Sequence, residues 1–136
     1  MRLAQLAFAL ACPVATGCSI SSARPGTGVV LVGDWGGPHA ALTLEPTGGT
    51  IAYDCAHGGL SVPVIPDGDG NFDVRGVHVR ERGGPVRMGE IPDSAPARYV
   101  GRVDGSRMSL RVAVGADTLG PFQLQRSTPA QLVRCL

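Results

Sequence analysis

The sequence predicts an all-β domain, a small antiparallel meander barrel of seven or eight short strands, with a small β-sandwich as the alternative. Gly (20) and Pro (11) are frequent among the 136 residues, so the chain has many turns. From Val29 onward, short stretches alternate apolar and polar residues with the period of two that is typical of strands. Turn signals separate these stretches at regular hairpin spacing, which favours pairing between strands that follow each other in sequence.

The first half of the domain predicts two hairpins. The stretch 39–55, HAALTLEPTGGTIAYDC, contains two strand patterns with a turn at 46–49. The stretch 59–81 turns at 67–70, where Asp and Gly alternate. The segment 83–96 has no alternation, and we expect it to be the longest irregular stretch.

The second half predicts a third hairpin and one or two further strands. Residues 97–103 and 107–114 flank the turn signal Asp-Gly-Ser at 104–106, and the second of these strands alternates cleanly. Another strand pattern covers 118–126, and 132–135 is the candidate for a last short strand. Aromatic residues make up only 4% of the chain, so we expect a core of Val, Leu, Ile and Ala. Strands of about six or seven residues would let side chains fill such a barrel, so we expect no large ligand cavity.

The first 17 residues have the features of a lipoprotein-type signal peptide. Arg2 precedes an apolar run at 3–11 that is too short to span a bilayer. Residues 15–18, Ala-Thr-Gly-Cys, resemble the bacterial lipobox, in which a peptidase cuts before the Cys and the thiol carries a lipid. The alternatives are an ordinary secretory signal, cut after Gly17 or Ala23, and a buried N-terminal helix of a cytosolic protein.

This interpretation gives a signal peptide at 1–17, a flexible tether at 18–28 and a single β-barrel domain at 29–136. We expect export to the periplasm or cell surface, with lipid on Cys18 holding the chain to a bacterial membrane. All twelve cationic side chains are Arg, the net charge is +1 and no basic stripe is present, so we expect no nucleic-acid partner. The expected form is a monomer.

Export determines how the four cysteines are used. Cys12 leaves with the signal peptide and Cys18 is consumed by lipid or lies in the tether. Cys55 and Cys135 remain, an even pair in an oxidising compartment, and we predict a disulfide between them. The bridge would close a loop of about 80 residues, which stabilises the fold by about 3–4 kcal/mol in the chain-entropy model.

The cluster Asp54-Cys55-Ala56-His57 also has catalytic and metal-binding interpretations. Cys55 beside His57 would suit a thiol nucleophile and its base, but this needs a free thiol. A metal site would require Cys55 to converge with His39, His57 and His78, and no closely spaced ligand pair supports it. We favour the disulfide, with Asp54 and His57 supporting the neighbouring turn.

The stretch 67–73, DGDGNFD, resembles the start of a calcium loop. The EF-hand pattern then needs Gly at its sixth position and Glu at its twelfth, where this chain has Phe72 and His78. A Gly- and Asp-rich hairpin turn explains the same residues. We expect no metal or other cofactor.

The irregular stretch after 80 is the candidate partner-binding loop. It carries Glu81, Arg82, Arg87 and Glu90, and loops on a rigid scaffold often hold binding residues. The alternative is a solvated connection whose charges serve solubility.

Two resemblances add to this interpretation. Gly33-Asp34-Trp35 resembles the G-x-W with which calycins, the superfamily of the lipocalins, begin their barrels. The resemblance implies that Trp35 closes one end of the barrel and that a cation from the last strand stacks on it. Arg126 continues the face of Phe122 and fits this role, with Arg134 as the rival candidate.

The chain is also similar to a family of small exported, lipoprotein-like bacterial proteins of unassigned function. The matching segments are W-G-G-x-H at 35–39, D-C-A-x-G at 54–58, G-G-P-x-R at 83–87, A-R-Y-x-G-x-x-D-G at 97–105 and R-C-L at 134–136. This resemblance implies no activity.

The sequence therefore predicts a membrane-tethered, non-enzymatic binding module, with a protein or small-ligand partner at its loops and no catalytic residues. One alternative is a small envelope hydrolase or metal-dependent enzyme that uses His39, Asp54 and His57. The other is a purely structural envelope protein.

Overall fold

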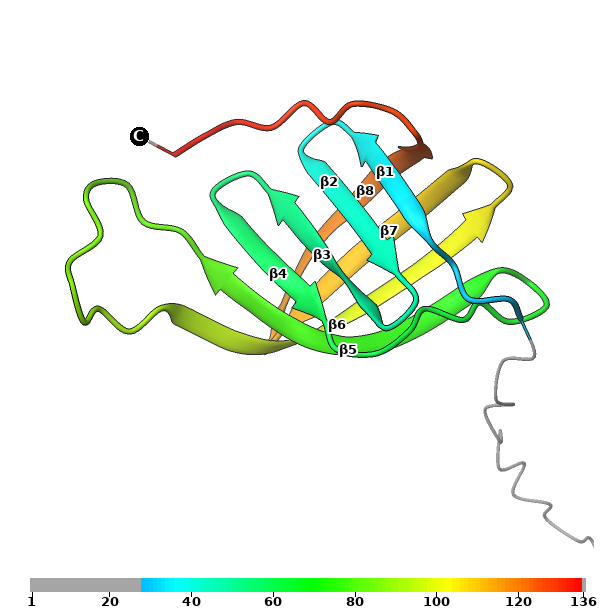
Figure 1. Cartoon of the computed structure of the whole chain (residues 1–136), viewed down its shortest axis with the longest axis horizontal. Helices are drawn as coiled ribbons and strands as arrows, with labels where there is room; N and C mark the ends of the chain where they lie inside the picture. The colour runs from blue at the N-terminus through cyan, green and yellow to red at the C-terminus, as the bar shows by residue number, and fades with distance from the viewer. Residues whose placement is uncertain (1–27, 136) are drawn as a thin grey trace, which may run out of the picture.

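The computed structural model describes residues 28–135, so the predicted signal peptide, the predicted lipid site at Cys18 and most of the predicted tether lie outside the described residues. As predicted, the described chain forms a closed all-β meander barrel (Figure 1). Its strands are β1 (Gly33–Gly37), β2 (Ala40–Glu45), β3 (Gly48–Tyr53), β4 (Ala56–Leu60), β5 (Asn71–Arg80), β6 (Asp93–Asp104), β7 (Arg107–Val114) and β8 (Asp117–Arg126). Within residues 28–135, no helix is long and apolar enough to cross a membrane.

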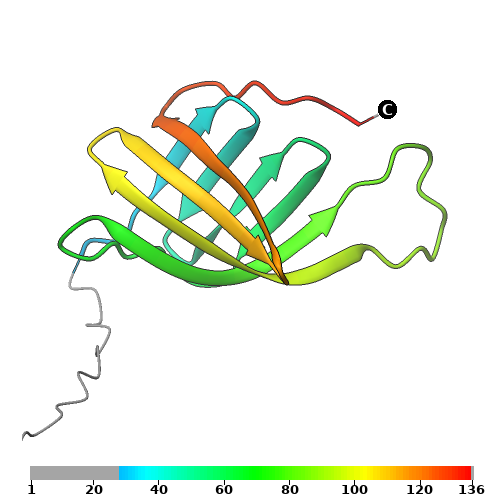
Figure 2. The same ribbon diagram turned by 180° about the vertical axis from the view of Figure 1, so that it is seen from behind.

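The first and last strands close the barrel. Each strand pairs antiparallel with its neighbour in sequence, and β8 returns to β1 through Trp35 opposite Arg126 and Gly36 opposite Gln125 (Figure 2). A sandwich would leave open edges on two sheets, so this pairing decides between the two predicted architectures. The calycin-like meander barrel is confirmed.

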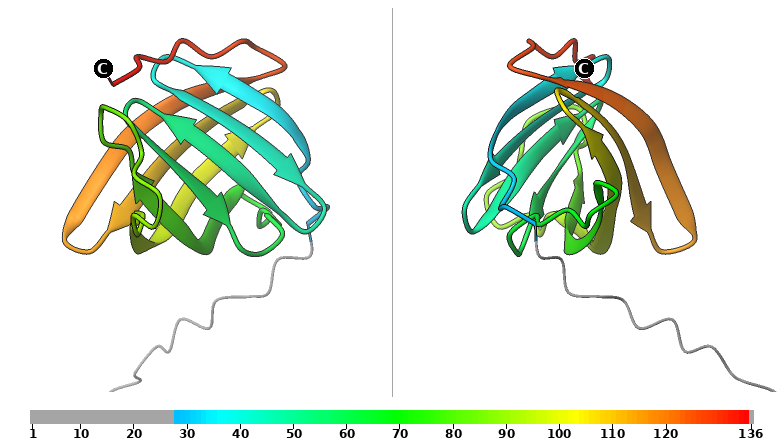
Figure 3. Two further views of the ribbon diagram at one scale, coloured as in Figure 1. Left: turned by 60° about the vertical axis from the view of Figure 1, so that its left-hand side comes forward. Right: turned by 90° about the vertical axis from the view of Figure 1, so that its right-hand side faces the viewer.

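The C-terminal tail, residues 127–135, runs back along β1 beside this seam (Figure 3). Gln131 donates its N–H to the Gly37 carbonyl at 3.0 Å and accepts the His39 N–H at 2.8 Å. The predicted last strand at 132–135 was wrong, because the tail makes a single parallel bridge, between Gln131 and Pro38 just after β1, and no ladder. The strand β1 already has β2 and β8 as ladder partners, so little of its backbone is free to pair.

Gly36 explains how the tail comes so close to the barrel. A Cβ at this position would lie 2.0 Å from the Thr128 carbonyl oxygen and 2.9 Å from the Ala130 nitrogen. Any side chain would therefore displace the tail from β1.

The barrel interior is built by the alternation that the sequence shows. On β7, Met108, Leu110 and Val112 are buried, whereas Arg107 and Arg111 on the opposite face are exposed. The largest fully buried side chains are Trp35, Tyr99, Leu42, Met108, Leu110, Val64 and Val112. Aromatic rings thus take a larger share of the core than the composition suggests.

The two ends of the barrel differ. The closed end carries the β2–β3 and β6–β7 turns and the connection 61–70, whose Val64 is fully buried and accepts the Leu31 N–H at 2.8 Å. The open end carries the β1–β2, β3–β4 and β7–β8 turns and the loop 81–92. The described chain starts at the closed end, because Gly28 packs against Pro66.

Candidate functional site

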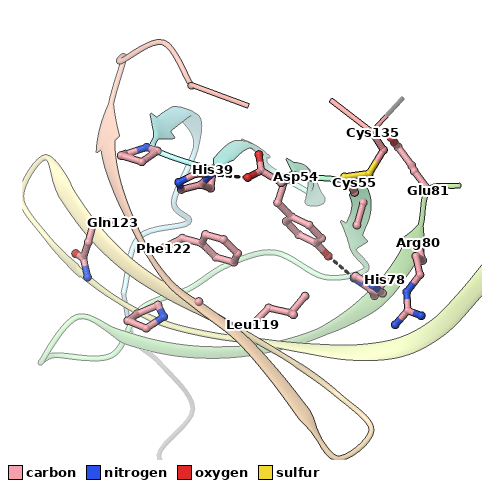
Figure 4. Close-up of a pocket in the computed structure, with 15 residues that line it drawn as sticks. His39, Asp54, Cys55, His78, Arg80, Glu81, Leu119, Phe122, Gln123 and Cys135 are labelled. Atoms are coloured by element: carbon pink, nitrogen blue, oxygen red, sulfur yellow. Dashed lines mark hydrogen bonds and ion pairs between the residues drawn. A yellow bond between two sulfur atoms is a disulfide. The ribbon is translucent and has the colours of Figure 1, made fainter. Parts of the chain in front are cut away.

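A cavity of about 830 Å³ opens at this open end (Figure 4). Its lining comes from β3, β4, β5 and β8, the β1–β2 and β3–β4 turns, the start of the loop after β5 and the tail: Pro38, His39, Tyr53, Asp54, Cys55, Ala56, His78, Arg80, Glu81, Leu119, Gly120, Pro121, Phe122, Gln123 and Cys135. The expectation of no large cavity was therefore wrong. Strands β5, β6 and β8 have ten, twelve and ten residues, longer than expected, and they extend the wall beyond the packed core.

A bulge in β8 shapes one wall of the cavity. Leu110 pairs with Phe122 whereas Val112 pairs with Leu119, so Gly120 and Pro121 lie opposite a single residue of β7. The extra residue turns Leu119 onto the same face as Phe122, and both line the cavity. Bulges at barrel rims commonly re-aim side chains in this way.

Three near-parallel rings line the cavity side by side. Tyr53 of β3 lies between His78 of β5, with ring centroids 5.5 Å apart, and Phe122 of β8, at 5.8 Å. The interplanar angles are 12° and 8°. Rings at these separations are offset from one another, and together they form an apolar strip across the wall.

Hydrogen bonds fix the polar atoms of this strip. The Tyr53 hydroxyl bonds His78 Nδ1 at 2.7 Å, and the Tyr99 hydroxyl donates to the Val77 carbonyl at 2.8 Å. Burial raises the pKa of Tyr53 and of Tyr99, and a hydrogen bond with Tyr99 raises that of Tyr53 further, so both hydroxyls remain protonated. Burial, together with the positive charge of Arg80, lowers the pKa of His78, so its imidazole is neutral near pH 7.

Gly58 makes room for these two hydroxyls. A Cβ there would lie 2.0 Å from the Tyr99 hydroxyl oxygen and 3.2 Å from that of Tyr53. We therefore expect Gly58→Ala to lower the free energy of unfolding by about 1–3 kcal/mol, measured by urea denaturation. Gly59→Ala is the matched control, since its Cβ would meet only the Gly49 carbonyl oxygen at 3.8 Å. Equal effects of the two substitutions would contradict this packing.

Asp54 anchors the tail at the cavity rim. Its Oδ1 accepts the Val133 N–H at 2.6 Å, and its Oδ2 lies 2.5 Å from His39 Nδ1. The Val133 N–H, followed by His39, lowers the pKa of Asp54. Asp54 thus joins the β1–β2 turn to the tail, a wider role than the predicted support of its own turn.

His57 forms a separate pair with Glu81, at 2.9 Å between Nδ1 and Oε1. His39, His57 and His78 therefore have three different partners and do not converge with Cys55. Among residues 28–135, no group of three or more His, Cys, Asp or Glu side chains could hold a metal ion. The metal interpretation has no support from this geometry.

The structure joins Cys55 to Cys135 by a disulfide, with the two Cα atoms 5.1 Å apart. The bridge attaches the end of the tail to the β3–β4 turn, and both cysteines line the cavity. A thiol nucleophile at Cys55 would require this bond to be absent. The disulfide therefore makes the tail part of the rim.

Arg126 lies over the Trp35 ring, with its guanidinium carbon 4.9 Å from the ring centroid. This is the stacking that the calycin resemblance implies. The cation on the ring is Arg126 and not the alternative candidate Arg134. Trp35 is 1% exposed, and its indole nitrogen has no hydrogen-bond partner within the described residues. The ring therefore contributes by packing and by the cation on its face.

The predicted partner loop projects from the open end, where it links β5 to β6 (Figure 1). Its groove of about 590 Å³ includes Arg82, Arg87 and Glu90, and Glu81 at its base. Arg82 lies 3.8 Å from Asp93 across the loop. The hydrophobic side chains of Val86, Met88 and Ile91 are almost fully exposed.

The calcium-like stretch 67–73 forms a turn in which one of its own carboxylates accepts the backbone N–H groups. Asp67 Oδ1 accepts the N–H groups of Asp69 and Asn71, both at 2.9 Å. These backbone donors, Asn71 first, lower the pKa of Asp67. The carboxylate is therefore already used by the turn.

The sequence analysis missed the cavity-facing roles of Tyr53, His78, Arg80 and Phe122. One signal was available, because Phe72, Val74, His78 and Arg80 alternate on one face of β5. Comparisons of this chain with protein families, curated proteins and solved structures give no match.

Proposed function

We propose that this chain is an exported, lipid-tethered β-barrel that binds a small, mainly apolar ligand in the cavity at its open end without transforming it. The cavity is the observation that carries the proposal. Its volume lies in the range of about 300–1,000 Å³ that is usual for ligand pockets. Aromatic and aliphatic side chains line it, with a few polar groups at defined positions, as in most small-molecule sites.

Binding should be measurable with an apolar fluorophore whose emission rises in apolar surroundings, such as N-phenyl-1-naphthylamine. We expect saturable binding to the wild-type barrel. Leu119→Trp fills part of the cavity and should weaken binding at least about tenfold. Val100→Trp is the matched control, because Val100 is exposed on the outer face of β6. Equal binding by both variants would contradict a site in the cavity.

The proposed tether follows from the lipobox-like residues 15–18 and the position of Gly28. Because Gly28 lies at the closed end, a tether leaving from it would let the cavity face away from the membrane. In a bacterial host, Cys18→Ser should abolish fatty-acid labelling and remove the mature protein from the membrane fraction. Unchanged labelling and fractionation would contradict lipidation at Cys18.

The loop 81–92 is the place we propose for any protein partner, on the basis of its exposed Val86, Met88 and Ile91. Photo-crosslinking from position 88 in whole cells would capture such a partner, and a lack of crosslinks would count against it. The enzyme alternative instead predicts turnover that His39→Ala removes.

A further inference from the structure

Strand β5 places two polar side chains along the cavity wall. His78 and Arg80 are two residues apart, so the alternation of the strand puts them on the same face, about 7 Å apart along its axis. Both line the cavity, Figure 4 shows them next to each other, and the His78 ring stacks on that of Tyr53. A ligand group of two or three atoms can contact both side chains at once.

The contacts of His78 use one of its ring nitrogens and leave the other for a ligand. The side chain is 8% exposed, and its Nδ1 lies 2.7 Å from the Tyr53 hydroxyl. We assign the proton of this bond to the Tyr53 hydroxyl, so that Nδ1 is the acceptor. A neutral imidazole that accepts at Nδ1 carries its proton at Nε2. His78 therefore offers a hydrogen-bond donor, and no hydrogen bond within the described residues uses it.

Arg80 supplies a positive charge that the surrounding side chains do not neutralise directly. It makes no salt bridge within residues 28–135. Asp93 lies across from it in the β5–β6 register, but the ion pair of that carboxylate is with Arg82. An arginine beside a buried donor favours a planar anion such as a carboxylate.

The acidic groups around the cavity are already engaged. Asp54 accepts the Val133 N–H and pairs with His39, and Glu81 pairs with His57. Each carboxylate therefore has a partner of its own at the rim. Arg80 is the lining charge that remains without one in the described chain.

We infer that the ligand is a planar aromatic acid, whose ring lies against Tyr53 and Phe122 and whose carboxylate accepts from His78 Nε2–H and pairs with Arg80. This inference rests on the proposed function and narrows it to a ligand class. The strip of near-parallel rings gives a flat ring offset-stacking contacts. The two β5 side chains give the acid group one hydrogen bond and one opposite charge.

The test compares two probes of the same shape, 1-naphthoate and its neutral amide, 1-naphthamide, by displacement of the fluorophore. The Cys18→Ser protein allows this in the absence of detergent. We expect naphthoate to bind at least about tenfold more tightly than naphthamide. Arg80→Gln should remove this preference, because naphthoate loses far more affinity than naphthamide when the positive charge is removed. Arg75→Gln is the matched control, since Arg75 lies exposed on the opposite face of the same strand, and it should keep the preference.

The nitrogen-15 chemical shifts of His78 provide a second readout that does not depend on a ligand. They should show the proton on Nε2, and a proton on Nδ1 would overturn the inference. Equal binding of the two probes, or a preference that survives Arg80→Gln, would also overturn it while the proposed function stands. If neither probe nor the fluorophore binds, the proposed function fails, and this inference fails with it.

Discussion

Removal of the Cys55–Cys135 disulfide should lower the free energy of unfolding by about 3–4 kcal/mol. The bridge joins residues 80 positions apart, so without it the unfolded chain gains much conformational freedom. For a domain of this size, the loss corresponds to a melting temperature lower by roughly 10–20 °C. Thermal denaturation of the Cys55→Ser, Cys135→Ser double variant would measure the effect.

Two controls accompany this prediction. Tryptic digestion without reduction should give a cross-linked peptide that contains both cysteines. Wild-type protein in reductant should have the same melting temperature as the double variant. Reductant should not change the melting temperature of the double variant itself. A change below about 1 kcal/mol, or rapid alkylation of Cys55 near neutral pH, would contradict the bridge and revive the thiol interpretation.

Trp35→Ala should have a similarly large effect and lower the free energy of unfolding by about 3–5 kcal/mol. The ring is 1% exposed and is the largest of the fully buried side chains, so its removal leaves a cavity near the closed end. Trp35 is the one tryptophan of the chain, so urea denaturation should be followed by circular dichroism.

Arg126→Gln is the companion variant for Trp35. It removes the cation and keeps the ring, so we expect a smaller loss of about 0.5–1 kcal/mol. If Trp35→Ala costs less than about 1 kcal/mol, the ring closes nothing, and the calycin comparison loses its main support.

Local sequence features predicted most of the barrel. The tip of the first hairpin, expected at 46–49, lies between β2 and β3, which end and begin at Glu45 and Gly48. Turn chemistry at 104–106 was equally informative, because Asp and Gly favour that backbone conformation. A turn also forms at 67–70, but residues 61–66 before it are irregular, so the hairpin expected at 59–81 is formed by β4 and β5 across the long connection 61–70. The disulfide was predicted from the number of cysteines that would remain after the expected export. These inferences depend only on residues that are neighbours in sequence or on the expected oxidising compartment.

The side-chain contacts and the cavity at the open end could not be predicted from local sequence features. His39 meets Asp54 across 15 positions, and Val133 meets the same carboxylate across 79. Such contacts depend on strand register and on where the tail runs, which alternation alone does not specify. The cavity depends on the lengths of three strands and on the bulge at Gly120, where the pattern in β8 loses its period of two.

The central claim, that the open end of the barrel is a ligand site, can be tested most directly by mapping 1-naphthoate onto the protein by NMR. We predict that amide signals of His39, Tyr53, His78 and Phe122 shift on titration, together with that of Cys135 in the tail. Signals of the turn 67–70 at the closed end should stay in place. Shifts confined to the closed end or to the loop 81–92, or no saturable shifts at all, would contradict the account.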